Sequence, residues 1–342
     1  MTSVHYYFRH PGNIYFSIEK LFSEVAGQVN RFNPQRFRIT LLFLPFPTGF
    51  ANLWKNISYL RKTQSAVNHI TGDAHYAILG CSKKNINILT VHDCVMLRRL
   101  KRTDPKFWII KWLWYDLPVR KADMITVISE NSKQELIHFT GCAENRIRVI
   151  GNFYDARFQK VQHIFNKQEP IILFVGTAPN KNLDRLITAL KGLRIKLHII
   201  GNPTKAQTEK LKQNNISFVV SSGLSDEEMR QAYINCDLLA FASTYEGFGL
   251  PILEAQLTGR VVLTSNISPM KEVAGNAAML VDPYNEDSIR NGLVRLIEED
   301  SFRDQMIEKG FVNAKRFNPA SVAGQYAALY EELMLKKRTA EN

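Results

Sequence analysis

The sequence predicts an α/β protein made of two doubly wound units, in which helices cover both faces of a parallel sheet. Short apolar runs alternate with helical segments along the chain, as is typical of parallel strands buried on both sides. A chain of 342 residues is longer than a typical single domain with one hydrophobic core. The stretch 159–170 is polar and ends in a proline, which indicates a linker between two domains. We therefore predict a first domain at 1–160, a second at 168–316 and a final helical segment at 317–342.

The first half is predicted to hold five strands. An opening strand precedes Pro11 and Gly12, and four apolar runs follow, at 38–44, 87–91, 124–128 and 147–150. Their continuous apolar character predicts that they are buried. Ser132 and Glu135 have the spacing of a capping box, which predicts a helix that begins there.

The second half repeats this alternation. Apolar runs predict strands at 171–175, 197–200, 237–241 and 260–264, and helices are predicted at 183–190 and from Ser225 to about Asn235. The second of these helices is headed by a capping box formed by Ser225 and Glu228. Because ligands of doubly wound sheets bind beyond the carboxyl ends of strands, we expect the functional residues in strand-end loops.

The net charge of +12 belongs entirely to the first half of the chain. Residues 1–160 hold 23 basic and 11 acidic residues, whereas the remainder holds 21 of each. Nucleic acid, anionic lipid headgroups and a phosphorylated acceptor are candidate partners for the first half, and an incidental basic surface is the alternative.

The cysteines and the apolar segments favour a cytoplasmic protein. Four scattered cysteines form no CxxC pair, which suits a reducing compartment and argues against structural zinc. The N-terminus shows no charged leader before an apolar core, and no apolar run approaches the ~18 residues of a spanning helix.

The most informative segment runs from Glu246 to Glu254 and contains the sequence GFGLP. It follows a predicted strand and opens a predicted helix, for which Pro251 suits the first position. The amides of Gly249 and Leu250 then point out of the helix start, where phosphate binds readily. The carboxylates on either side, Glu246 and Glu254, suit hydrogen bonds from hydroxyl groups. A nucleotide sugar has this layout, with sugar hydroxyls, a diphosphate and ribose hydroxyls in order.

Two glutamates separated by seven residues around GFGLP resemble the signature of retaining glycosyltransferase family 4. Further segments resemble that family in the expected order: 90–93, 122–129, 149–152, and 174–177 with 180–183. The resemblance covers roughly residues 85–290, and the first 80 residues match only loosely. It implies the GT-B fold, with two Rossmann-like domains facing each other across a cleft and a last helix that returns to the first domain.

The resemblance also implies roles for individual residues. Glu246 would contact the transferred sugar, Lys181 the diphosphate and His92 the donor sugar, and these three are the catalytic candidates. Glu254 would hold the ribose, and loops at Gly201 and at 221–224 would contact a uracil or guanine base. The complete predicted donor site is Gly12, Gly176, Thr177, Lys181, Gly201, Ser221, Leu224, Glu246, Gly247, Phe248, Gly249, Leu250 and Glu254. Thr177 and Asn180 depart from the family, which often has arginine at both places.

The implied chemistry is sugar transfer with retention, in which the leaving phosphate takes the proton of the acceptor. A covalent intermediate on Glu246 is the alternative. The chain contains no Asp-x-Asp motif, so we expect no metal and no cofactor apart from the UDP- or GDP-sugar donor.

The segment from Arg98 to Tyr115 is basic and rich in aromatic residues. It holds three of the four tryptophans within seven residues, after the cluster Arg98-Arg99-Leu100-Lys101-Arg102. Such a segment suits an anionic membrane interface, which predicts a peripheral enzyme on the inner face of the plasma membrane. Its acceptor would be a glycan or lipid-linked glycan of a cell-surface polysaccharide (O-antigen, capsule or exopolysaccharide). The alternative is that these aromatic residues pack into the core of the first domain.

Two other functions compete with a transferase. A sugar-nucleotide epimerase of the same fold would be expected to lack the two-glutamate arrangement, and a phosphorylase would need a longer chain. A nucleic-acid-binding protein is suggested only by the basic half, and no helix-turn-helix, finger or RNA-binding signature is present in the sequence. We therefore expect no nucleic acid partner.

Overall fold

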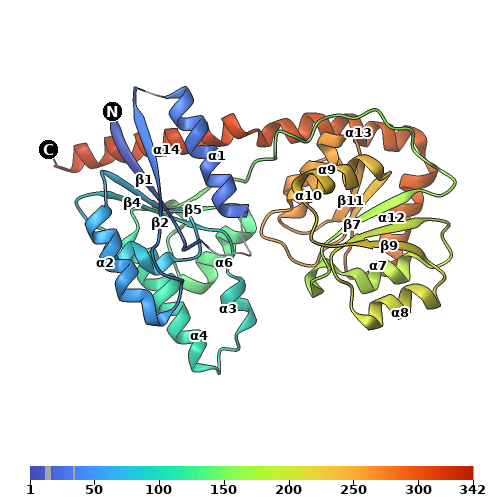
Figure 1. Ribbon diagram of the computed structural model, residues 1–342, viewed down its shortest axis with the longest axis horizontal. Helices are drawn as coiled ribbons and strands as arrows, with labels where there is room; N and C mark the ends of the chain where they lie inside the picture. Colours follow the sequence, from blue (N-terminus) through green and yellow to red (C-terminus); the bar gives the residue numbers. More distant parts are fainter. Residues whose placement is uncertain (12–16, 34, 342) are drawn as a thin grey trace. The chain divides into compact units, whose positions relative to one another are not determined.

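The computed structural model describes residues 1–11, 17–33 and 35–341, which fold into two units (Figure 1). The first unit comprises Met1–Phe153 and Pro319–Asn342, and the second comprises Tyr154–Asn318. Each unit contains a six-stranded sheet with helices packed on it. The prediction of two doubly wound α/β units is confirmed.

The sheet of the first unit has the order β2-β1-β3-β4-β5-β6, and each described pairing is parallel. Its strands are β1 (Thr2–Phe8), β2 (Phe37–Phe43), β3 (Val67–Ile70), β4 (Ile86–Val91), β5 (Met124–Val127) and β6 (Ile147–Val149). The helices of this unit are α1 (Ser17–Phe32), α2 (Leu53–Thr63), α3 (Val95–Arg99), α4 (Pro105–Ile110), α5 (Leu117–Lys121), α6 (Glu130–Thr140) and α14 (Pro319–Glu341). Short turns of other helix types are η1 (Phe50–Asn52), η2 (His75–Gly80), η3 (Lys111–Asp116) and η4 (Glu144–Arg146), of which η3 is a π-helix.

The sheet of the second unit has the order β12-β11-β10-β7-β8-β9, again with parallel pairing. Its strands are β7 (Ile171–Val175), β8 (Lys196–Ile200), β9 (Ser217–Ser221), β10 (Leu238–Phe241), β11 (Val261–Ser265) and β12 (Met279–Val281). Its helices are α7 (Leu183–Leu190), α8 (Lys205–Gln213), α9 (Asp226–Asn235), α10 (Leu250–Thr258), α11 (Met270–Ala274), α12 (Glu286–Glu298) and α13 (Asp300–Ala314), with short turns η5 (Pro179–Lys181) and η6 (Lys315–Phe317). This is the Rossmann strand order, in which the chain reverses direction across the sheet between β7 and β10.

Two local predictions for the first unit are wrong in detail. The run 38–44 forms β2, but β2 is the edge strand and every second residue at its start is exposed, so it is not fully buried. Helix α6 begins earlier than Ser132, because the Ser129 side chain accepts the hydrogen bond from the Ser132 amide and is the cap. Ser132 is therefore the third residue of the helix. The Ser225 capping box is confirmed.

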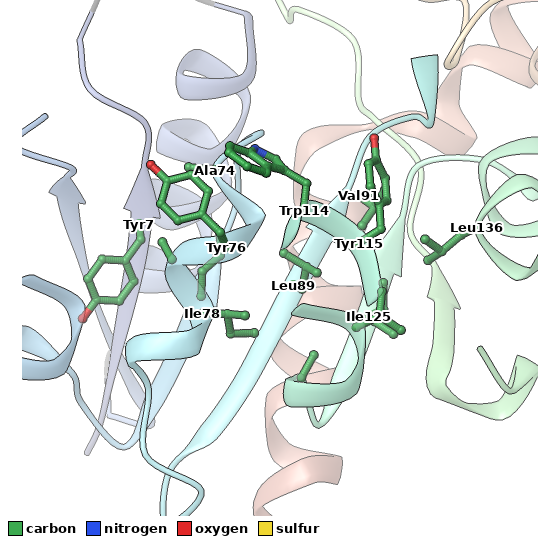
Figure 2. Packing of buried hydrophobic residues seen from close by; sticks show 14 of the residues in the cluster. Tyr7, Ala74, Tyr76, Ile78, Leu89, Val91, Trp114, Tyr115, Ile125 and Leu136 are labelled. Carbon is green, nitrogen blue, oxygen red and sulfur yellow. The ribbon is translucent and has the colours of Figure 1, made fainter. Parts of the chain in front are cut away.

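The core of the first unit has one apolar cluster on each face of its sheet. On one face, Tyr76 and Trp114 pack edge to face with ring centroids 4.9 Å apart, beside Leu89 and Ile125 of the central strands (Figure 2). On the other face, α1 and α14 cover the sheet and bury Tyr330. The last helix therefore completes the core of the first unit.

A chain of buried polar groups ties α14 to this sheet. The Tyr330 hydroxyl lies 2.6 Å from the Tyr6 hydroxyl and 2.9 Å from His69 Nδ1, and His69 Nε2 lies 2.7 Å from the Thr90 hydroxyl. Burial lowers the pKa of His69 from 6.5 to about 3. His69 is therefore a neutral hydrogen-bonding group at physiological pH.

Because the pKa of His69 is lowered in the folded protein, we expect the protein to lose stability in mild acid. The unfolded imidazole protonates near pH 6.5 and the folded one only near pH 3, so the unfolded state binds more protons as the pH falls below 6.5. Between pH 7 and pH 5 we expect His69 alone to lower the free energy of unfolding by about 2 kcal/mol. Urea unfolding of the wild type and His69→Gln at both pH values measures this difference. Equal pH dependence of the two proteins would contradict the expectation.

The stretch 159–170 folds onto the second unit, and the boundary between the units lies before it, at Phe153 and Tyr154. The buried carboxylate of Asp237 accepts hydrogen bonds from His163 Nε2 (2.7 Å), the Asn166 amide (2.8 Å) and the Ile171 amide (2.7 Å). Because one side chain at the start of β10 satisfies these donors, a segment without apolar periodicity is fixed to the sheet. It is part of the second unit rather than a linker.

Candidate active site

The predicted site residues gather at the point where the strand order of the second unit reverses. Strands β7 and β10 are neighbours at the centre of this sheet, and the chain leaves them toward opposite edges. The loop 176–182 follows β7, and the loop 242–249 follows β10. Adjacent loops at such a point form the usual ligand site of a doubly wound sheet.

Backbone and side-chain hydrogen bonds join these two loops. The Thr244 amide donates to the Asn180 carbonyl (2.8 Å), and Asn180 Nδ2 donates to the Tyr245 carbonyl (2.8 Å). The Asn180 side chain therefore fixes the loop that carries Glu246.

Asn182 is a positioning residue that the sequence reasoning missed. Its side chain is buried and donates to the Ala242 carbonyl (2.9 Å) and to the Pro283 carbonyl (2.7 Å). Its φ of 69° lies in the left-handed region, which asparagine tolerates better than most residues. In the sequence, the only indication of this role is an asparagine directly before an apolar helix. Its partners Ala242 and Pro283 are too distant in the sequence to be predicted.

Lys181 and Glu246 meet between the two loops. Lys181 Nζ lies 2.7 Å from Glu246 Oε1, and the two side chains are only 19% and 14% exposed. The ammonium also stands 4.8 Å from the centroid of the Phe241 ring. Two predicted catalytic residues, 65 positions apart in sequence, are thus in direct contact at the carboxyl ends of β7 and β10.

The start of α10 contacts the same phenylalanine. A Cβ atom on Gly249 would stand 3.8 Å from the Phe241 ring, and Gly249 has a φ of +118°, which favours glycine. Among the residues that the structure describes, the Gly249 and Leu250 amides donate no backbone hydrogen bond, as expected at a helix start. The start of a helix and an ammonium thus both lie next to one ring, and each attracts an anion.

Two details of this helix differ from the prediction. Helix α10 begins at Leu250, so Pro251 is its second residue rather than its first, and Glu254 lies on the second turn rather than the first. Glu254 lies beside Tyr233 of α9, whose hydroxyl is buried. Burial, and then the charge of Glu254, raise the pKa of Tyr233. Tyr233 is a second neighbour of the site that the sequence reasoning missed.

Two family models match consecutive parts of the chain. The model for glycosyltransferase family 4 matches residues 16–158, and the model for glycosyl transferases group 1 matches residues 155–312. The chain belongs to glycosyltransferase family 4. The matches meet close to the boundary between the two units, and the second contains the Lys181–Glu246 pair and α10.

Curated relatives of this family-4 chain include mannosyltransferases of Escherichia coli. The serotype-specific mannosyltransferase WbdA is 26% identical over 265 residues, which are 69% of this chain and 32% of WbdA. The O-antigen chain mannosyltransferase B is 34% identical over 236 residues, 62% of this chain and 61% of that protein. The chain thus matches about a third and about three fifths, respectively, of these relatives.

A solved structure confirms the GT-B fold. The Anabaena protein HepE, solved in complex with UDP and glucose, superimposes with a TM-score of 0.75 over 97% of this chain and 100% of that chain. Its sequence is 15% identical.

In this family-4 chain the residues that follow β7, Gly176 and Thr177, contact those that follow β8, Gly201 and Asn202. The Thr177 hydroxyl accepts a hydrogen bond from the Asn202 amide (3.1 Å), and a Cβ atom on Gly201 would stand 3.0 Å from Thr177. The Gly201 amide donates to the Ser221 carbonyl (2.7 Å). Gly176, Thr177, Gly201 and the end of β9 therefore form one edge, although the Ser221 hydroxyl is already 2.9 Å from His198 Nε2. Leu224 is half-buried in the following loop.

The remaining predicted site residues lie before α10, in the first unit or outside the described residues. Gly247 and Phe248 precede α10, where the buried Phe248 packs edge to face on Phe317 with centroids 5.6 Å apart. Gly12 lies outside the residues that the structure describes. His92 belongs to the first unit, directly after β4.

The His92 ring is fixed by its own unit. His92 Nε2 lies 2.8 Å from the Thr71 carbonyl, which only accepts, so Nε2 carries the proton. Burial lowers the pKa of His92, so the ring is neutral and Nδ1 is an acceptor. The ring packs edge to face on Phe22.

Gly176 controls the position of Lys181. A Cβ atom at Gly176 would lie 2.9 Å from Lys181 Cε, and Gly176 has a φ of +88°. We expect Gly176→Ala to push the Lys181 side chain away from Glu246 and to lower turnover of a nucleotide sugar about tenfold or more. Gly192→Ala is the matched control, because Gly192 has a φ of +75° and open space around its Cβ position. Equal turnover of the two variants would contradict the expectation.

No group of three or more histidine, cysteine, aspartate or glutamate residues is placed to hold a metal ion in the part of the chain that the structure describes. Over the same residues, no helix combines the length and the apolar character needed to cross a bilayer.

Proposed function

We propose that this chain transfers a hexose, with mannose as the first candidate, from a nucleoside diphosphate to a glycan or lipid-linked acceptor. Its reaction retains the anomeric configuration and needs no metal. The Lys181–Glu246 pair beside the start of α10 is the observation that carries this proposal. Mannose is favoured because two of the curated relatives are named mannosyltransferases.

The leaving group accounts for the cationic side of the site. When the bond between the anomeric carbon and the phosphate oxygen breaks, negative charge develops on the diphosphate and positive charge on the sugar. The Lys181 ammonium and the amides of Gly249 and Leu250 are fixed donors for that negative charge. Bound diphosphate would draw Lys181 from its pairing with Glu246, which frees the Glu246 carboxylate for the sugar hydroxyls.

The acceptor reacts on the same face from which the diphosphate leaves. The acceptor oxygen forms a bond to the anomeric carbon, and its proton passes to the departing phosphate oxygen, so no separate base is required. A covalent sugar on Glu246 is the alternative route to retention.

His92 of the first unit and Glu254 of the second unit are each proposed as acceptors of hydroxyl groups. His92 Nδ1 is an acceptor because Nε2 donates to Thr71, so it suits a hydroxyl of the donor sugar. Glu254 accepts from the ribose hydroxyls, and the buried Tyr233 side chain lies beside it. The edge formed by Thr177, Gly201 and Ser221 contacts the base, which is uracil or guanine.

The acceptor and location complete the proposal. O-antigen synthesis by one relative and the basic first half support an acceptor in a cell-surface polysaccharide, carried on lipid at the inner face of the plasma membrane.

A donor screen tests this function. Purified protein is incubated in EDTA with GDP-mannose, UDP-glucose, UDP-galactose and UDP-N-acetylglucosamine, and released nucleoside diphosphate is measured. We expect one donor to be turned over well above the others, with GDP-mannose first. NMR of the product should show the α-linkage of the donor. No turnover of any donor, or an inverted product, would refute the proposed function or its stereochemistry.

A further inference from the structure

The aromatic segment after Arg98 is divided between the core and the surface of the first unit. Phe107, Trp114 and Tyr115 are buried, and Figure 2 shows Trp114 packed beside Tyr76. Trp108 and Trp112, in contrast, are 55% and 54% exposed. They are four positions apart on consecutive helical turns of α4 and η3, so they share a face. Core packing explains one half of the segment and leaves the other half facing solvent.

A second group of exposed aromatic residues comes from a segment far earlier in the chain. Trp54, on the first turn of α2, is 77% exposed, and Phe50 of η1 is also exposed. The Phe50 ring lies 5.1 Å from the buried Trp114 ring, which places η1 against the aromatic segment. Figure 1 draws α2 and α4 at the same end of the first unit.

The surroundings of these side chains are basic. Lys55, Arg61 and Lys62 lie on α2 with Trp54, and residues 98–111 contain six basic residues and one acidic residue, Asp104. Two of these six are ion-paired: Arg98 with Glu135 (2.6 Å) and Lys111 with Asp116 (2.6 Å). Asp104 is used as the cap of α4, where it accepts from the Lys106 amide. The Trp108 indole donates to the Arg102 carbonyl (2.9 Å), which holds the basic loop beside the exposed aromatic residues.

We propose that Phe50, Trp54, Trp108 and Trp112, with the basic side chains around them, form one surface that docks on a bilayer containing anionic phospholipid. Tryptophan rings favour the interface between headgroups and acyl chains, and lysine and arginine residues bind anionic headgroups. The excess of basic residues gives this apolar surface charge complementarity to such a bilayer. The role of this surface, which is to bring the protein to a lipid-linked acceptor, rests on the proposed function. The existence of the surface does not.

Co-sedimentation with vesicles tests the aromatic part. The full chain is mixed with vesicles of phosphatidylcholine alone or with one third phosphatidylglycerol, at low salt. We expect binding to the anionic vesicles at least tenfold tighter than to the neutral ones. The double variant Trp54→Ser/Trp108→Ser should bind the anionic vesicles at least tenfold more weakly than the wild type. The matched control is Phe32→Ser, because Phe32 is an exposed aromatic residue of α1 outside this surface.

Charge reversal tests the basic part. Lys101→Glu/Arg102→Glu should lose binding to anionic vesicles, whereas Lys205→Glu/Lys212→Glu, two exposed lysines of α8 in the second unit, should not. Equal loss in both double variants would indicate attraction by net charge alone and would overturn a defined docking surface.

The remaining outcomes are also decisive. Absent vesicle binding, or binding unchanged by loss of the tryptophans, would overturn the proposal. Concentration-dependent self-association that these substitutions abolish would identify a second copy of the chain as the occupant and would overturn it too. Donor turnover with a water-soluble acceptor separates this surface from the proposed function. Vesicle binding without any turnover would retain the surface and remove the transferase function, and turnover without binding would do the reverse.

Discussion

Replacing Lys181 with alanine is expected to lower kcat for sugar transfer by about 10²–10³-fold, the usual effect of removing one fixed donor to a developing negative charge. Lys181 is the ammonium that stands between the two central loops, next to Phe241 and Glu246. Thr177 and Asn180 supply no positive charge where the family often has arginine, so the loss should not be compensated locally. Steady-state rates with a saturating donor measure the effect.

The matched control for this variant is Lys205→Ala. Lys205 is an exposed lysine at the start of α8, and we expect its removal to change kcat less than twofold. Lys181→Arg should restore part of the rate, because it returns the positive charge with a different shape. Wild-type turnover by Lys181→Ala would show that this lysine does not contact the diphosphate.

Replacing Glu246 with alanine is expected to reduce kcat by a similar factor and to raise KM for the donor. The substitution removes the carboxylate that binds the sugar and leaves the Lys181 ammonium, which is mostly buried, without its partner. Glu246→Gln should keep the fold and lose most of the rate, since the amide retains the shape but not the charge. Rates are compared with those of Glu272→Ala, an exposed glutamate of α11.

Azide addition distinguishes the two routes to retention in the Glu246→Ala variant. If the diphosphate leaves and the acceptor enters on one face, azide should not restore turnover. A glycosyl azide of inverted configuration, formed at a rate that rises with azide concentration, would identify Glu246 as a covalent nucleophile. Unchanged turnover by Glu246→Ala without azide would remove this residue from the site altogether.

Sequence reasoning located the strands next to the site because their signals are local. The residues of β7 (171–175) and β10 (238–241) are apolar throughout, because these strands are buried on both faces of the sheet. The glycines before α10 were readable for the same reason: the φ of +118° at Gly249 is a property of one residue. Hence the loop that carries Glu246 could be placed before any contact was known.

Features that depend on distant partners were not predictable. Strand β3 contains Asn68 and His69, which look too polar for a central strand. Both are buried, where Asn68 bonds to Asn87 (3.1 Å) and His69 to Thr90 and Tyr330. Asn182 and Tyr233 were overlooked because their roles come from Ala242, Pro283 and Glu254, far away in the sequence.

Binding of the diphosphate at the start of α10 tests the central claim most directly. A crystal structure of the chain with GDP or UDP, grown and soaked in EDTA, would show where the phosphates lie. We predict phosphate oxygens within hydrogen-bond distance of the Gly249 and Leu250 amides and of Lys181 Nζ, with the ribose hydroxyls on Glu254. A nucleotide bound elsewhere on the chain, with these amides and Lys181 untouched, would contradict this account.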